Sequence, residues 1–137
     1  MVKPAELIET AARYLNPTTV DDRHSGGVAS ALLTRAGAVF CGVCIDVPCS
    51  MGFCAEHAAA AAMVAAGQSH IAQLVAVARD DATGALTVLP PCGRCREFLY
   101  QLDRRSLSAE VVLSVSTVTI LAELLPTRDP QPGATRL

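Results

Sequence analysis

The sequence predicts an α/β protein: a three-layer α/β/α sandwich with a mixed sheet of about five strands. Two observations favour this class. Segments with helical spacing alternate with segments typical of strands, and residues 71–78 form a near-continuous apolar run. Such a run is typical of a strand covered by helices on both faces. Of the 137 residues, 51% are hydrophobic but only 4% are aromatic, so Ala, Val and Leu must form most of the core.

The first half of the chain predicts a helix, a hairpin and a second helix. Apolar residues recur at helical spacing near the N-terminus until Pro17 ends the run. Two strand-like segments then flank a turn at 35–38. An alanine-rich segment follows the loop at 48–53 and closes at Gly67, a plausible helix C-cap. In order, the predicted elements are a helix at 4–16, strands at 28–34 and 39–45, and a helix at 54–66.

The second half adds two strands and two helices. The apolar run at 71–78 is followed by a turn-rich segment at 79–89. Beyond it, the pattern predicts a helix at 92–102, a strand at 111–115 and a short helix at 118–125. We expect residues 1–126 to form a single domain. Residues 127–137, which hold two prolines and a glycine, are expected to be a disordered tail.

Composition argues against several classes of protein. The net charge of −2 and the lack of a basic run argue against a nucleic-acid partner. No segment reaches the roughly 18 apolar residues that span a membrane. The N-terminus lacks the order of a signal peptide, so a cytoplasmic location is expected. In that compartment the six cysteines are more readily metal ligands or reduced thiols than disulfides.

Two motifs at predicted helix starts carry the chemistry: Cys54-Ala55-Glu56 and Pro91-Cys92-Gly93-Arg94-Cys95. If both helices lie on one face of the sheet, their N-terminal ends can converge and bring the three thiols together. Three thiolates can hold Zn²⁺ and leave its fourth position for water. Glu56, two residues after the first thiol, can then reach that water as a proton carrier. Arg94 is expected to hydrogen-bond a ligand sulfur and to supply a cation that offsets the negative charge of three thiolates around one zinc ion.

Two other interpretations of these motifs remain open. In the first, the zinc site is closed and stabilises a non-catalytic binding protein, with Glu56 serving only as an acid in the first helical turn. In the second, Cys92 and Cys95 form a redox pair without zinc. A closed site would need a fourth protein ligand, which the motifs do not supply.

Cys54-Ala55-Glu56 with Pro91-Cys92-Gly93-Arg94-Cys95-Arg96 resembles the cytidine deaminase family, and the resemblance covers about residues 28–126. The resemblance implies zinc held by Cys54, Cys92 and Cys95, with Glu56 carrying protons. The implied reaction converts a cytosine nucleoside to its uracil form and releases ammonia, as in pyrimidine salvage. It also implies the fold of that family and a homotetramer that takes a small nucleoside-like substrate.

The residues expected to contact substrate depart from this pattern. Cys44 and Asp46 occupy the positions of a family Asn-x-Glu motif that hydrogen-bonds ribose, and we expect further contacts from Ala55 and Pro91. His57 follows the first motif where the family usually has Arg. Arg94 within the chelating pair instead resembles the blasticidin-S deaminase branch, although the aromatic C-terminal tail of that branch is missing. Cytidine or deoxycytidine is therefore one candidate substrate, and blasticidin S or another aminated heterocycle is the alternative.

The remaining histidines and cysteines suggest structural roles. His57 is expected to pack or hydrogen-bond behind the site, whereas His24 and His70 are expected at the surface. Cys41 and Cys44 are three residues apart on a predicted strand, so their thiols should point to opposite faces. A second metal site there is not expected.

Overall fold

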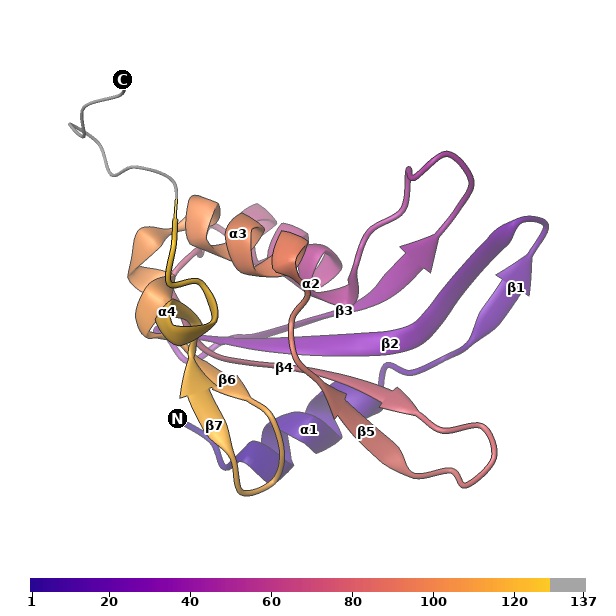
Figure 1. The fold of residues 1–137 in the computed structure, drawn as a ribbon, viewed down its shortest axis with the longest axis horizontal. Coiled ribbons are helices and arrows are strands. Elements are labelled where there is room, and N and C mark those ends of the chain that lie inside the picture. The colour runs from indigo at the N-terminus through magenta and orange to yellow at the C-terminus, as the bar shows by residue number, and fades with distance from the viewer. Residues whose placement is uncertain (129–137) are drawn as a thin grey trace.

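A mixed β-sheet forms the centre of the computed structural model, which describes residues 1–128 (Figure 1). Within these residues the sheet has seven strands, where the sequence predicted about five. The strands are β1 (Thr18–Val20), β2 (Arg23–Thr34), β3 (Val39–Asp46), β4 (Ile71–Arg79), β5 (Leu86–Leu89), β6 (Glu110–Val112) and β7 (Val118–Ile120). β4 and β6 are parallel and all other pairs are antiparallel, which confirms the mixed sheet.

Helices cover both faces of this sheet, as the sequence predicted. α1 lies on one face, and α2 and α3 lie side by side on the other (Figure 1). The helices are α1 (Pro4–Ala12), α2 (Ala55–Ala65), α3 (Gly93–Leu102), the 3-10 helix η1 (Arg104–Ser108) and α4 (Leu121–Leu124). No helix among residues 1–128 has the length and apolar character needed to cross a bilayer.

β4 contributes to both halves of the hydrophobic core, which explains its apolar run. Every residue from Ile71 to Val77 is buried. Leu74 packs with α2 and α3, whereas Val75 and Val77 pack with α1. Because successive side chains of a strand point to opposite faces, a strand between two helical layers must be apolar at nearly every position.

Several predicted boundaries were wrong. The first helix ends at Ala12 rather than 16, and β5 forms inside the segment predicted to consist of turns. Residues 118–120 form β7 rather than the start of a helix, because they pair with β6 and their β-branched side chains suit a strand. Of the predicted tail at 127–137, residues 129–137 lie outside the described part of the chain. The single-domain boundary at 126 stays a prediction.

Close packing of α2 on β3 depends on Gly42. A Cβ atom at Gly42 would overlap the backbone nitrogen of Ala59 and lie 2.6 Å from the Cβ of Ala58. The hairpin strand therefore contacts the backbone of α2 directly, with no side chain between them. This contact sets the height of α2 above the sheet, and with it the position of the residues at the start of the helix.

Gly42→Ala is predicted to destabilise the protein by roughly 1–3 kcal/mol, because the added methyl group would push α2 away from the sheet. Thermal unfolding followed by circular dichroism measures the change. Gly27→Ala is the matched control, since nothing lies within 4 Å of a Cβ at that position. Equal melting temperatures for the two variants would show that α2 does not depend on this contact.

Candidate metal centre

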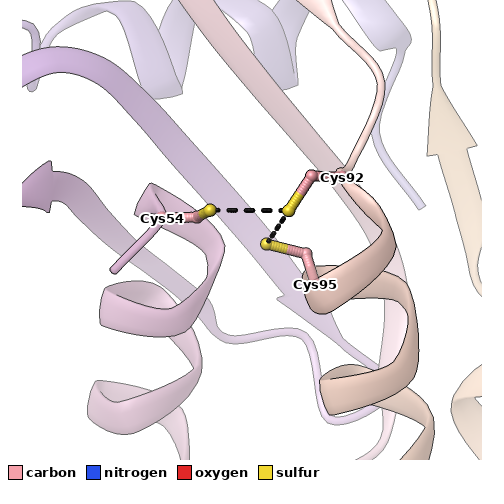
Figure 2. Close-up of side chains that lie close together, drawn as sticks. All are labelled: Cys54, Cys92 and Cys95. Atoms are coloured by element: carbon pink, nitrogen blue, oxygen red, sulfur yellow. Dashed lines mark hydrogen bonds between the residues drawn. The ribbon is translucent and has the colours of Figure 1, made fainter. Parts of the chain in front are cut away.

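Three cysteine thiols meet where α2 and α3 begin (Figure 2). The Sγ atoms of Cys54 and Cys92 are 3.5 Å apart, as are those of Cys92 and Cys95. All three sulfurs lie within 4.8 Å of one another. In residues 1–128 no other group of three or more His, Cys, Asp or Glu side chains could hold a metal ion. The structure thus brings together the three cysteines that the sequence singled out.

The helix starts explain why these thiols converge. Cys54 and Cys92 are the N-cap residues of α2 and α3, and neither uses its side chain to cap its helix. Cys95 lies in the first turn of α3. Both helices cover the same face of the sheet, so their N-terminal ends lie together (Figure 1). The positive ends of two helix dipoles therefore point at the sulfurs and favour thiolates there.

Backbone donors favour the thiolate of Cys92 in particular. Burial opposes its ionisation, but hydrogen bonds from the backbone N–H groups of Cys95 and Arg94 and from neighbouring thiols outweigh that effect and lower its pKa. For Cys95 the balance is reversed, because burial and the nearby Glu56 charge raise its pKa. A cation at the cluster would favour the thiolate form of all three residues.

The donor set fits a zinc ion. Thiolates hold zinc at about 2.3 Å, so two sulfurs of a tetrahedral site lie about 3.8 Å apart. The two separations of 3.5 Å are close to that value. Soft sulfur ligands in a tetrahedral arrangement are typical of zinc sites. Cys95 is buried, Cys54 is half-buried and Cys92 is exposed, so the cluster is open on one side rather than enclosed.

Glu56 lies directly beside the cluster. Its Oε2 atom is 3.5 Å from the sulfur of Cys95, and the side chain is only 4% exposed. Burial raises the pKa of the carboxyl group above its ordinary value. A buried carboxyl in this position can take up a proton and return it within the site.

A pocket of about 160 Å³ opens beside the thiols and Glu56. Cys44 and Ala55, both predicted to contact substrate, line it. Asp46 and Pro91 do not: Asp46 lines an adjoining hollow with Cys44, and Pro91 is buried, its carbonyl accepting a hydrogen bond from Arg96 Nε at 2.8 Å. The full lining is Val28, Cys44, Cys54, Ala55, Glu56, Ala76, Leu89, Pro90 and Cys92.

Sequence reasoning missed the apolar wall formed by Ala76, Leu89 and Pro90. The continuous apolar run of β4 hides which of its residues faces a pocket. Leu89 and Pro90 could have been found from their place just before the second cysteine motif.

Cys41 and Cys44 point to opposite faces of β3, as predicted. Cys41 packs with the core cluster under α1, whereas Cys44 lines the pocket on the other face. The sulfur of Cys44 also accepts a hydrogen bond from the backbone N–H of Val28 at 3.3 Å. The two thiols therefore cannot share a metal ion.

Arg94 contacts the site through its backbone more than through its side chain. Its guanidinium donates to the carbonyl of Gly52 at 3.4 Å, and the residue is exposed. Among residues 1–128 its side chain makes no hydrogen bond to a cysteine sulfur, contrary to the expectation from the sequence, because it reaches the loop before α2 instead. The positive charge of Arg94 still acts on its neighbours: burial lowers the pKa of His57, and repulsion by the Arg94 guanidinium lowers it further.

His57 packs behind the thiols, as the sequence predicted. Its ring stacks on Phe98, with centroids 4.1 Å apart and planes 9° from parallel. Its Nδ1 atom lies 3.4 Å from the sulfur of Cys95. Of the other histidines, His24 is exposed as expected, but His70 is half-buried and its Nε2 atom has no partner among the described residues.

Comparison with known proteins identifies the family. No family model matches the sequence. Blasticidin-S deaminase from Bacillus cereus is 31% identical over 98 residues, which is 69% of each chain. The chain belongs to the cytidine deaminase family. Cytidine deaminase from Mycobacterium tuberculosis has a TM-score of 0.74 at 26% identity over 96% of this chain and 100% of its own. The enzyme from Burkholderia pseudomallei has a TM-score of 0.72 at 27% identity, over 93% and 99%.

Membership of this family indicates the function of the three-cysteine cluster. The protein is a zinc-dependent aminohydrolase of the cytidine deaminase family, and its cluster is typical of the zinc site of these enzymes. The fold, with helices on both faces of a mixed sheet, is the cytidine deaminase fold.

Replacing Cys54, Cys92 or Cys95 singly with Ser is predicted to lower bound zinc from about one ion per chain to roughly a tenth of that, because a neutral hydroxyl is a poor zinc ligand. Metal content of the purified variants, measured by mass spectrometry, checks this. Cys41→Ser is the matched control, since that thiol lies on the other face of the sheet. A comparable zinc loss in the control would contradict the assignment.

Proposed function

We propose that the protein hydrolyses the exocyclic amine of a cytosine nucleoside, or of an analogue, to give the uracil form and ammonia. The observation that carries this proposal is the buried Glu56 carboxyl between the Cys95 sulfur and an open pocket of about 160 Å³. A pocket of this size suits a flat heterocycle with its amine directed at the cluster. The resemblance to cytidine deaminases over nearly the whole chain supports the same reaction.

The pocket wall would hold the ring and exclude water. Val28 of β2, Ala76 of β4 and Leu89 present apolar surface to the pocket, opposite the start of α2. Apolar walls favour a flat ring over bulk water and strengthen the electrostatic interactions inside the site.

Glu56 would move the protons of the reaction. A zinc ion held by the three thiolates would act as a Lewis acid and make a water molecule nucleophilic at neutral pH. Glu56 would take one proton from the attacking water as its oxygen bonds to the amine-bearing carbon, and would deliver that proton to the adjacent ring nitrogen. It would then carry the remaining proton from the new C–OH group to the amine, so that the C–N bond breaks, ammonia leaves and the uracil carbonyl forms. Both transfers require one carboxyl that lies beside the cluster and faces the pocket, as Glu56 does.

Glu56→Gln is predicted to retain zinc but to lower kcat by roughly 10²–10⁴-fold or more, because an amide cannot carry a proton. Ammonia release and metal content, measured on the same sample, check this. Glu97→Gln is the control, since the Glu97 carboxylate accepts a hydrogen bond from Gln101 on the surface of α3. If zinc-loaded wild type released no ammonia from any aminopyrimidine tested, the protein would be a zinc-stabilised binding protein instead.

We further propose that the sugar, or its replacement, lies in the adjoining hollow of about 380 Å³. This hollow shares Cys44 with the ring pocket and adds several polar groups, including Thr19, His24 and Asp46. The Asp46 carboxylate can accept a hydrogen bond from a hydroxyl, whereas the Cys44 thiol is a weak partner. Blasticidin S is the second candidate substrate, favoured by the 31% identity to blasticidin-S deaminase.

Asp46→Ala is predicted to lower kcat/KM for cytidine roughly tenfold or more, the usual cost of losing a hydrogen bond to a charged group. Free cytosine, which has no sugar, should be unaffected. Steady-state kinetics with cytidine, deoxycytidine, blasticidin S and cytosine measure the effect, with Asp81→Ala as a surface control. An equal loss for cytidine and cytosine would show that Asp46 does not read the sugar.

The proposal extends to assembly and location. A homotetramer would cover the exposed apolar face of α2, which includes Ala61, Ala62 and Val64. A cytoplasmic location, with a role in pyrimidine salvage, would keep the three ligand thiols reduced. The free state of all six cysteines is consistent with such a compartment.

A further inference from the structure

The zinc cluster carries a charge that the protein must stabilise. Three thiolates and one Zn²⁺ ion sum to a net charge of −1. Cys95 is fully buried, so its sulfur cannot obtain hydrogen bonds from bulk water. A buried anionic group without a donor is costly, and proteins supply donors to such groups from neighbouring residues.

The arginines of α3 do not supply this donor through their side chains. Arg94 donates to the carbonyl of Gly52. Arg96 donates to the carbonyls of Pro91 and Leu124, at 2.8 and 3.2 Å. Both guanidinium groups thus make their hydrogen bonds to backbone carbonyls rather than to sulfur.

His57 is the side chain that can donate a hydrogen bond to the buried sulfur of Cys95. Within residues 1–128, the side chains that hydrogen-bond a sulfur of the cluster are His57, Glu56 and the cysteines themselves. An ionised carboxylate and a thiolate can only accept hydrogen bonds, so neither can serve a second thiolate. In the zinc-loaded site Cys95 is a thiolate, and the proton between it and His57 must therefore belong to Nδ1.

The ring of His57 is held in the orientation that this bond requires. It reaches from the first turn of α2 across to α3, where Phe98 stacks on it at 4.1 Å with planes only 9° apart. Phe98 lies three residues after Cys95, on the same side of α3, so one helix carries both the sulfur and the ring that orients its partner. The stack fixes the plane of the imidazole and leaves Nδ1 aimed at sulfur, 3.4 Å away.

We propose that His57 is a positioning residue that donates its Nδ1–H to the Cys95 thiolate, with Phe98 holding the ring in place. This rests on the zinc ligands assigned above and goes beyond the proposed function. In this chain a stacked imidazole takes over a role that a cationic side chain could otherwise fill. Groups that orient or hydrogen-bond metal ligands typically change metal affinity about 10–100-fold when they are removed.

Cobalt(II) exchanged into the site tests the proposal without reference to activity. Loss of a hydrogen bond makes a thiolate a better electron donor, so His57→Leu should move the sulfur-to-cobalt charge-transfer band to longer wavelength. The same variant should release zinc to a chromogenic chelator roughly tenfold faster or more. His57→Asn keeps an N–H near the position of Nδ1 and should restore most of both properties.

Further variants distinguish the hydrogen bond donated by His57 from the packing of its ring on Phe98. Phe98→Leu leaves the imidazole in place but frees its plane, so it should give a smaller shift in the same direction and faster zinc release. His70→Leu is the matched control, because that histidine precedes β4 and makes no contact with the thiol cluster among the described residues, so the variant should behave as wild type. If His57→Leu does not fold, a Phe98→Leu variant identical to wild type, or a His57→Asn variant shifted further than Phe98→Leu, overturns the proposal.

Two results would overturn the inference. One is a charge-transfer band and a zinc-release rate that are the same in wild type, His57→Leu and Phe98→Leu. The other is an equal effect of His57→Asn and His57→Leu, which would mean that ring volume matters and the N–H does not. A wild-type protein with no sulfur-to-cobalt band would instead refute the assigned ligands, so the two failures are distinguishable.

Discussion

The contact between β3 and α2 is the constraint on which the site depends. Because Gly42 has no side chain and α2 presents Ala58 and Ala59, strand and helix approach until their backbones are in contact. The start of α2 then lies low over the sheet, next to the start of α3. Larger residues at any of these three positions would raise the helix and separate Cys54 from the other two thiols. An alanine-rich helix is thus a geometric requirement here as well as a source of helical propensity.

The close packing of α2 on β3 also places in a small volume several groups that repel one another when they are ionised. Three thiols and a carboxyl lie together, and burial raises the pKa values of Glu56, Cys54 and Cys95. The protein offsets part of this cost with two helix N-termini and backbone N–H donors, and the metal ion offsets most of the remainder. Grouping polar side chains in this way lowers the stability of the folded state. Burial of the apolar layers on both faces of the sheet supplies the compensating stability.

The sequence predicted the chemistry better than the architecture around it. Cys54, Glu56, Cys92 and Cys95 could be recognised because the ligand spacing and the helix starts are local features. β7 and β5 could not, because residues 118–120 and 86–89 are strands through their pairing with the preceding strands β6 and β4, and runs of three or four residues carry too little periodicity to predict a strand alone. The stack of His57 on Phe98 was also invisible, since it joins two helices whose relative rotation no local pattern specifies. Nor does the sequence specify that Asp46 lines the adjoining hollow rather than the pocket, or that Pro91 is buried.

β4 links the site to a layer that has no chemistry of its own. Val75 and Val77 pack under α1, while Ala76 between them faces the pocket on the other side of the sheet. A change of volume beneath α1 therefore moves the strand that forms part of the pocket wall. Pocket width can be adjusted by substitutions on the far side of the molecule, without altering any residue that lines the pocket. The α1 layer is thus a place where substitutions can alter the pocket and leave the metal ligands and Glu56 untouched.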